Sequence, residues 1–195
     1  MERNYKSYEP ADIVIYQKDQ GTVLKEKSLI AFDSETKKIL AVGTDAERFV
    51  ENSDKNTMVI SPLRRGRIVD YSAAMSLFQV LLQKVWGKRT LLRPAIAICV
   101  PKGIEEVEKK AAQDCFYQAA KARDVLIVEQ PYEQFIVEMS EEIRTKYRTV
   151  IGITKEEPER YLREMFLEVQ LYAKQENISL DRAAEIFAQV CLGSK

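Results

Sequence analysis

The feature that most constrains the fold is a strand–turn–helix–strand pattern in the middle of the chain. Residues Ala95 to Val100 form an apolar run of the length and composition typical of a strand buried on both faces. Pro101 and Gly103 end this strand, and a helix with acidic residues in its first turn follows directly. A second apolar run, Val125 to Val128, ends in a carboxylate, an amide and a proline. This order, with polar side chains at the strand ends, predicts one edge of an α/β cleft of the nucleotide-binding type.

Composition restricts the function classes further. The chain has 195 residues, 46% of them hydrophobic and 31% charged, as in a globular protein that buries its own core. The 30 basic residues balance the 30 acidic ones, so no net field favours a nucleic-acid partner. The absence of histidine excludes Ser–His and Cys–His catalysis and removes the commonest zinc ligand. We therefore expect neither a metal site nor a nucleic-acid partner.

The cysteines and the apolar runs predict a cytoplasmic protein. Cys99, Cys115 and Cys191 each lie in an apolar stretch, which is typical of buried thiols in a reducing compartment. No run reaches the roughly 18 apolar residues of a membrane span. The first ten residues are too polar for a signal peptide.

The pattern of strands and helices divides the chain into three parts. Residues at about 20–62 read as a small β-rich subdomain, with a hairpin turn at Asp33 to Thr36 and one short helix capped by Thr44 or Asp45. Its expected strands are Leu29–Phe32, Ile39–Val42 and Thr57–Ile60. It is inserted into an α/β core that extends to residue 157. The core is expected to contain helices at Ser72–Trp86, Ile104–Ala120 and Tyr132–Met139, and strands at Asp12–Tyr16, Arg67–Val69 and Thr149–Ile153.

Residues 158–195 are expected to form two further helices. The first opens near Pro158, and the second is capped by Ser179 with Asp181 in its first turn. Each carries an apolar stripe, including Val169 on the first helix and Phe187 on the second. We expect these stripes to cover a face of the sheet, so that folding requires them. The alternative is that part of the stripe docks onto another subunit or filament.

Four motifs resemble the bacterial actin-like MreB family. RPAIAICVPKGIEEVEKKA (Arg93 to Ala111) and IVEQP (Ile127 to Pro131) are similar to its strand, V-P-x-G turn, helix and strand ending E-E-P. Upstream, Gly21 to Phe49 resembles its small subdomain, and Ser61 to Tyr71 resembles the connection back to the large subdomain. Because chance matches would not keep a common order, the set is far more specific than any one motif. The resemblance implies an α/β fold of the actin-like, ribonuclease H-like type, reduced to one large subdomain with an inserted small one.

Compared with the family pattern, both phosphate-binding loops are absent. Where the family has D-x-G-T-x-N-T, Lys6 to Asp12 contains no glycine, and Pro10 lacks the backbone N–H that such a loop must offer. Where a glycine-rich second loop is expected, Thr149 to Pro158 has one glycine and no aspartate, and reads as an ordinary core strand. We expect no catalytic residues, no cofactor and no ATPase activity. Residual binding of ATP and Mg²⁺ is the alternative.

Three residues are weak candidates for nucleotide binding. Gln130 stands where the family has the acidic residue that positions the attacking water, and Glu129 precedes it. Asp70 matches an aspartate that could line the cleft. For Asp70 we favour capping of the following helix, and for Glu129 and Gln130 we favour local hydrogen bonding at the strand end.

A candidate membrane contact precedes the apolar run Ala95 to Val100. In the family, the matching loop carries two adjacent large apolar residues that insert into the inner leaflet, and here they are Leu91 and Leu92. Their neighbours would suit an interface between acyl chains and anionic headgroups: Trp86, Lys88, Arg89 and Arg93. Alternatively, the two leucines begin the buried strand and Trp86 packs at the helix end.

The sequence therefore predicts a non-catalytic, MreB-like scaffold protein related to cell-shape determination. Its expected location is the cytoplasm, with peripheral contact to the inner membrane. Its expected partner is itself or an MreB-type filament. The alternative is a nucleotide-binding actin-like ATPase or sensor that a second chain completes.

Overall fold

A computed structural model describes residues 10–51, 56–64, 66–87, 93–154 and 169–192. The chain divides into two compact units, Pro10–Glu156 and a second unit that includes the C-terminal helices.

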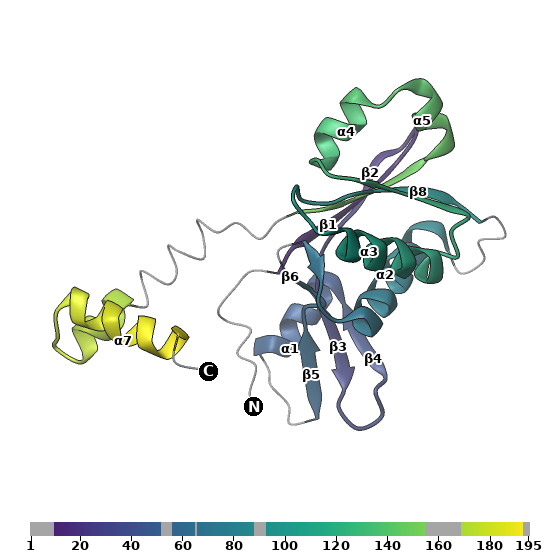
Figure 1. Cartoon of the computed structure of the whole chain (residues 1–195). Helices are drawn as coiled ribbons and strands as arrows, with labels where there is room; N and C mark the ends of the chain where they lie inside the picture. The colour runs from purple at the N-terminus through teal and green to yellow at the C-terminus, as the bar shows by residue number, and fades with distance from the viewer. Residues whose placement is uncertain (1–9, 52–55, 65, 88–92, 155–168, 193–195) are drawn as a thin grey trace. The chain divides into compact units, whose positions relative to one another are not determined.

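The larger unit is built on a five-stranded mixed sheet (Figure 1). Its strands, in chain order, are β1 (Asp12–Gln17), β2 (Gly21–Lys27), β8 (Ala95–Cys99), β9 (Asp124–Val128) and β10 (Thr149–Ile153). Their order across the sheet is β2-β1-β10-β8-β9. β10 runs antiparallel to β1 and parallel to β8, which is itself parallel to β9. The strand expected at Thr149 to Ile153 is therefore the central strand.

Helices cover both faces of this sheet (Figure 1). On one face, α2 (Tyr71–Trp86) and α3 (Glu106–Ala119) pack together, with the Phe78 and Phe116 ring centroids 4.3 Å apart. The other face is covered by α4 (Tyr132–Glu138) and α5 (Glu141–Lys146). α5 was not predicted, because it is short and has no buried residue.

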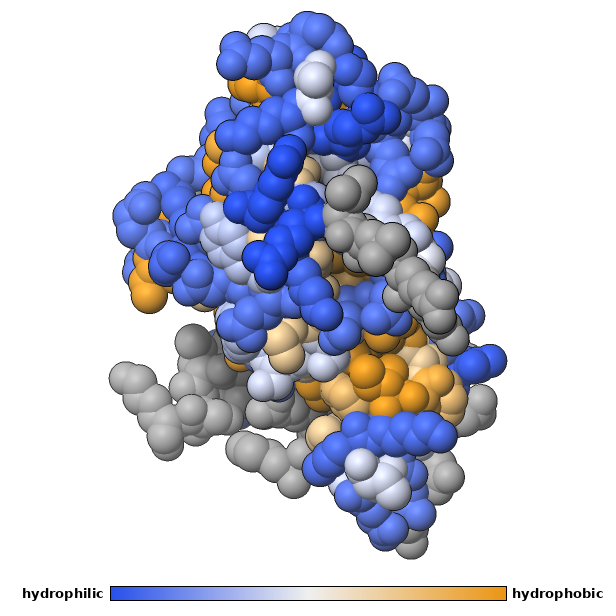
Figure 2. Space-filling model, turned by 90° about the vertical axis from the view of Figure 1, so that its right-hand side faces the viewer, coloured by the Kyte–Doolittle hydropathy of each residue, from blue (hydrophilic) through white to orange (hydrophobic). Residues whose placement is uncertain are grey.

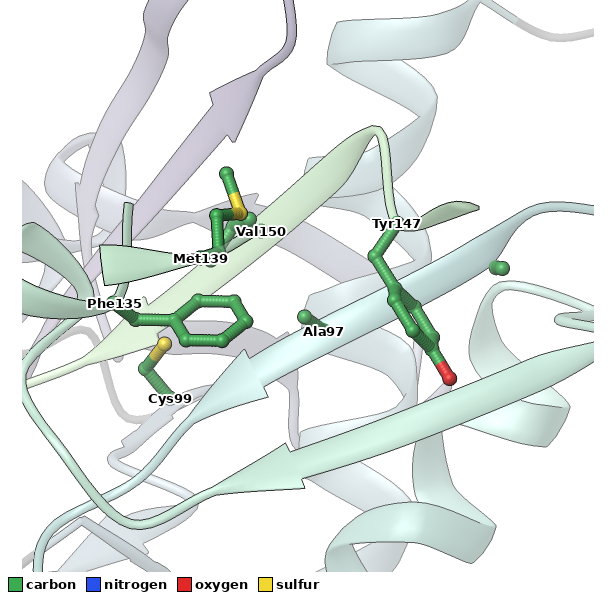
Figure 3. Packing of buried hydrophobic residues seen from close by; sticks show 7 residues of the cluster. Ala97, Cys99, Phe135, Met139, Tyr147 and Val150 are labelled. Carbon is green, nitrogen blue, oxygen red and sulfur yellow. The ribbon is translucent and has the colours of Figure 1, made fainter. Parts of the chain in front are cut away.

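Alternate residues of β8 serve the two faces. Ala95, Ala97 and Cys99 belong to a cluster with Phe135 and Met139 of the α4 segment, shown in Figure 3. Tyr147 and Val150 complete the cluster. All five residues of β8 are thus buried by elements of the same unit, which is why the run is uniformly apolar.

The small subdomain is a three-stranded antiparallel sheet of β4 (Ile39–Val42), β3 (Ile30–Asp33) and β5 (Thr57–Ile60). A 3-10 turn, η2 (Gly43–Ala46), and a short helix, α1 (Glu47–Glu51), give it a core of its own. The Asp33 carboxylate fixes the β3–β4 turn by accepting hydrogen bonds from the backbone N–H groups of Glu35 and Thr36.

Two expected boundaries differ from the structure. The small sheet begins at Ile30 rather than near residue 20, because β2 pairs with β1 in the main sheet. The expected strand at Arg67–Val69 is β7 (Arg67–Ile68), which forms a two-stranded ribbon with β6 (Leu63–Arg64) instead of joining the core sheet.

In the second unit, residues 169–175 are helical and α7 (Leu180–Leu192) follows. Val169, Ala173 and Ala183 form a small buried cluster there, flanked by Tyr172 and Ile178. The Ser179 hydroxyl accepts a hydrogen bond from the backbone N–H of Arg182 at 3.3 Å, which is the predicted cap. The opening of the first helix, near Pro158, lies outside the described residues. The side chain of Phe187 is likewise not described.

The C-terminal helices were expected to cover the sheet because one of its faces would otherwise be exposed to water. This reason does not hold for β8, since α4 and α5 cover the face formed by Ala95, Ala97 and Cys99. The packing of residues 158–195 on the core stays a prediction.

Candidate functional site

The candidate site lies where the parallel strands β10, β8 and β9 reach their carboxyl ends. Gly152 of β10 is in register with Cys99 of β8, and Cys99 is in register with Val128 of β9. The polar residues that follow these strands are therefore brought to one edge of the sheet, which is where open α/β sheets bind ligands.

Glu129 follows β9 and binds the turn after β8. One carboxylate oxygen, Oε2, accepts a hydrogen bond from the backbone N–H of Gly103 at 3.0 Å. The other, Oε1, lies 2.6 Å from the ammonium Nζ of Lys109 on α3. The hydrogen bond from Lys109, followed by that from Gly103, holds the pKa of Glu129 below its ordinary value. Glu129 is thus an ionised group that joins β9 to the Gly103 turn, in agreement with the local role expected for it.

The Gly103 turn is also held from its other side. The Arg67 guanidinium donates to the carbonyl oxygen of Gly103 at 3.3 Å and pairs with Glu108 at 3.2 Å. Gly66, at φ +73°, lies so close to Pro101 that a Cβ atom would overlap the proline ring. Both backbone polar groups of Gly103 are therefore engaged by protein side chains.

The start of α3 is closed by its own carboxylates. Glu108 accepts a hydrogen bond from the backbone N–H of Glu105 at 2.8 Å, and Glu105 accepts one from the backbone of Glu108. Glu106 adds a third acidic side chain to this first turn. A helix start that binds phosphate offers free N–H groups and a positive field. Here the capping box uses donors of this turn, and the acidic side chains oppose an anion.

The other two candidates play different parts. Asp70 is the N-cap of α2, and its Oδ1 accepts a hydrogen bond from the backbone N–H of Ala73 at 3.0 Å, which agrees with the predicted capping role. Gln130 is half-buried, and the local hydrogen bond expected for its side chain is not found among the described residues. Glu129 and Gln130 thus lie at the end of β9, whereas the Asp70 carboxylate caps α2.

Neither Lys109 nor Arg67 was predicted to take part in this site. Lys109 is far along the chain from Glu129, and Arg67 is far from Gly103, so spacing gave no signal for either contact. Glu129 was found because a polar residue followed a buried strand and because the segment resembles the family's strand ending E-E-P.

The two segments expected to lack phosphate loops can be placed only in part. Residues 1–9 lie outside the described part, and Asp12 opens β1 with its carboxylate 2.9 Å from Lys27 Nζ. Thr149–Ile153 is a fully buried strand, as expected for an ordinary core strand. No group of metal-binding side chains occurs among the residues that the structure describes.

Most of the proposed membrane contact cannot be placed. Lys88, Arg89, Leu91 and Leu92 lie outside the described residues. Trp86 is the last residue of α2 and is partly buried, and Arg93 is exposed. In the described segments, no helix combines the length and apolarity needed to cross a membrane.

Comparison with known families identifies the lineage. Residues 9–137 match the model of the MreB/Mbl protein family. The chain belongs to the MreB/Mbl family. It is 32% identical over 121 residues to the cell shape-determining protein Mbl of Bacillus subtilis (strain 168). It is also 32% identical over 127 residues to the cell shape-determining protein MreB of Escherichia coli (strain K12). Both alignments cover 62% of this chain but only 36% of the relative, so the chain spans little more than a third of these proteins.

Solved structures confirm the actin-like fold. MreB5 of Spiroplasma citri bound to ADP superposes with a TM-score of 0.54 at 27% identity, over 62% of this chain and 36% of that one. The AMPPNP-bound form of the same protein gives 0.54 at 26% identity, over 66% of this chain and 38% of that one. The MamK double helical filament, at 14% identity and a TM-score of 0.50, covers 63% of this chain and 42% of that one and shows likeness of fold alone.

Proposed function

We propose that this chain is a non-catalytic, actin-like scaffold of the cell-shape cytoskeleton. The curated relatives are named cell shape-determining proteins. The observation that carries the non-catalytic part is the engagement of Gly103 by Glu129 and Arg67. A triphosphate needs closely spaced free backbone donors, and at this edge the N–H groups of Gly103, Glu105 and Glu108 bind carboxylates instead.

Isothermal titration with ATP and Mg²⁺ tests this proposal. We expect no binding in the low micromolar range and no phosphate release above a protein-free control. Saturable low-micromolar binding that is lost in Gln130→Ala or Asp70→Asn would contradict it.

The competing proposal is a nucleotide-binding site that a second chain completes. It is favoured by the two MreB5 structures, in which that protein is bound to ADP and to AMPPNP. Repeating the titration over a range of protein concentrations separates the two proposals. Affinity that appears only as the protein self-associates supports a completed site, and its absence at every concentration supports the scaffold.

Self-association is the partner proposal that fits the fold. One solved neighbour is itself a double helical filament. Figure 2 shows an apolar area low on one face of this molecule, at the level of β3 and β4 in Figure 1. In the three-stranded sheet of the small subdomain, Leu40 of β4 is 39% exposed and Met58 of β5 is 41% exposed. Sedimentation velocity should show concentration-dependent association that weakens when both residues are replaced by serine; unchanged association would remove this surface from the proposal.

A cytoplasmic location with peripheral membrane contact remains part of the proposal. Its support is the resemblance of the Leu91–Leu92 loop to the family's inserting loop, together with the exposed Arg93 beside it. Two leucines and a few basic residues would hold one copy of the protein on a membrane only weakly, since each basic residue near the surface contributes about 1 kcal/mol. Firm attachment would therefore depend on assembly of several copies. Flotation with anionic vesicles should fall in a Leu91→Ser/Leu92→Ser variant of unchanged thermal stability. A variant that melts several degrees lower would instead place the leucines in the core.

The packing of residues 158–195 on the core is proposed as well, and deletion of these residues tests it. If they cover the core, the shortened protein should aggregate or lose cooperative unfolding. A soluble, cooperatively unfolding product would show that they form an appended arm for a partner.

A further inference from the structure

The small subdomain joins the large one through a narrow neck of two chain segments. The chain enters between β2, which ends at Lys27, and β3, and it leaves between β5 and β6. Ser28 and Ser61 face each other in this neck with their hydroxyl oxygens 3.0 Å apart, and they are 0% and 7% exposed. The Ser61 hydroxyl donates to the carbonyl oxygen of Leu63 at 2.9 Å, so Ser28 donates to Ser61. Because only two chain segments form this neck, it holds the small subdomain in place but restrains its angle relative to the large subdomain less strongly.

Glu26, two residues before the neck, connects three elements. It lies on β2, and its Oε2 accepts a hydrogen bond from the backbone N–H of Thr44 in η2 at 2.7 Å. Its Oε1 lies 3.0 Å from Lys84 Nζ on α2. The Glu26 side chain is only 16% exposed, which is low for a carboxylate. Burial alone would raise its pKa, but the hydrogen bonds from Thr44 and Lys84 outweigh that effect and hold the pKa of Glu26 below its ordinary value.

Gly43, the residue before Thr44, leaves room for the Glu26 carboxylate because it has no side chain. Gly43 has φ +70°, and a Cβ atom there would overlap the Glu26 carboxylate. The Gly43 N–H donates to the carbonyl oxygen of Leu29 at 2.8 Å, which places η2 directly beside the neck. Lys84 also reaches the Asp45 carboxylate at 3.9 Å, so α2 holds η2 at a second point.

We propose that Glu26, Thr44 and Lys84 form a bridge that sets the angle of the small subdomain on the large one, and that opening this bridge frees the small subdomain to turn about the Ser28–Ser61 neck. Through Glu26, η2 is tied to both β2 and α2, and the packing of β4 against α2 is the further contact that a rotation would have to break. In a chain that assembles, this angle decides which surface the small subdomain presents to a neighbour.

Spin-label distances in the full chain test the bridge. Labels are placed at Lys38→Cys in the β3–β4 turn of the small subdomain and at Val137→Cys on α4, both of which are exposed and lie outside the proposed self-association surface. Burial raises the pKa of Cys99 and Cys115 to about 12, so these thiols stay unlabelled, and Cys191→Ser removes the third cysteine. We expect one narrow distance distribution with Glu26 intact and a broad or shifted one in Glu26→Ala. Glu47→Ala, which removes an exposed carboxylate from α1 of the same subdomain, is the matched control and should leave the distribution narrow.

Two further variants keep the test decisive. Glu26→Gln keeps an acceptor for Thr44 but loses the charge that pairs with Lys84, so an intermediate width is expected. Lys84→Met keeps the Thr44 bond and should broaden the distribution less than Glu26→Ala. Hydrogen exchange of the Thr44 amide should rise about tenfold in Glu26→Ala, the change expected for losing a bond to a charged acceptor, with α3 unchanged. Narrow, unshifted distributions in both Glu26→Ala and Lys84→Met would overturn the proposal, and if Glu26→Ala fails to fold, Glu26→Gln and Lys84→Met decide it.

Discussion

Two strands at the centre of the main sheet differ in their relation to the MreB/Mbl family. β8 lies inside the family-matched residues 9–137, and β10 lies outside them. Yet β10 is bonded to β1 on one side and to β8 on the other, and all five of its residues are buried. Without β10, the strand pairs β2–β1 and β8–β9 would not be joined. Recognisable similarity therefore ends before the folding unit does.

The hydrophobic core shows the same division. Ala97, Cys99 and Phe135 come from the matched segment, while Met139, Tyr147 and Val150 come from the residues after it (Figure 3). A core that is shared in this way cannot be completed by either segment alone. The destabilisation caused by a substitution should therefore depend on how deeply the position is buried, regardless of whether it belongs to the family-matched segment.

The largest expected effect comes from placing a charge in each region. Ile151 lies outside the match and is fully buried, whereas Val137 lies inside it and is 81% exposed. Ile151→Asp buries a carboxylate without a partner, which should cost at least about 4 kcal/mol and unfold the protein. Val137→Asp should change the free energy of unfolding by less than about 0.5 kcal/mol. Circular dichroism melting checks both variants, and similar melting temperatures would break the comparison.

A second substitution tests the contact between the two regions. A Cβ atom on Gly152 of β10 would lie 2.6–2.8 Å from three side-chain atoms of Tyr132, which belongs to the matched segment. Gly152→Ala should therefore destabilise the fold by about 1–3 kcal/mol through overpacking. In a Tyr132→Ala background the penalty should shrink, since the ring atoms are gone. Denaturant unfolding of the four proteins of this double-mutant cycle measures the coupling, and additive effects would contradict a direct contact.

A smaller effect is expected at the helix caps. Asp70→Ala removes the α2 cap within the matched segment and should cost about 1 kcal/mol, with Asp70→Ser restoring much of it. Ser179→Ala removes the corresponding cap of α7. If residues 158–195 pack on the core, both changes should lower the same unfolding transition. A Ser179→Ala variant that leaves the main transition unmoved would argue against that packing.

The smallest effect is a pH dependence at the other end of the sheet. Asp124 of β9 lies 2.6 Å from Lys146 Nζ and accepts a hydrogen bond from the Tyr147 hydroxyl, so the matched strand is tied to the end of α5. The bond from Lys146, then that from Tyr147, lowers the pKa of Asp124. A lowered carboxyl pKa stabilises the fold above the unfolded value near 3.9 and loses that stabilisation as the pH falls through the folded value. Asp124→Asn should thus cost at most about 1 kcal/mol at pH 7, and the difference from the parent should vanish in acid. A difference that persists at pH 2 would rule out this origin.

Sequence reasoning located the elements better than their pairing. The strands at Ile39–Val42, Thr57–Ile60 and Thr149–Ile153 begin and end where predicted, because each is a short apolar run between polar residues. A strand buried on both faces carries no alternation that reveals its neighbours, so the central position of β10 could not be predicted. β2 has no buried residue, so no apolar pattern in it indicated that it pairs with β1 rather than with the small sheet.

At the candidate site, the sequence predicted roles that depend on neighbours along the chain. The cap by Asp70 could be predicted because the N-cap and the amide that it binds are three residues apart. Local bonding by Glu129 was also expected, but its partners Gly103 and Lys109 are brought to it only by the parallel pairing of β8 with β9. The Glu26 bridge has no signal in the sequence, since it joins residues on three separate elements.

Hydrogen exchange of the β10 backbone amides tests the central claim most directly, because it needs no substitution. If β10 is the strand that joins the two halves of the sheet, its amides should exchange as slowly as those of β8, at the rate set by global unfolding. Exchange of the β10 amides at the rate of the exposed β3–β4 turn, while β8 stays protected, would show that the fold is complete without β10 and would contradict the account.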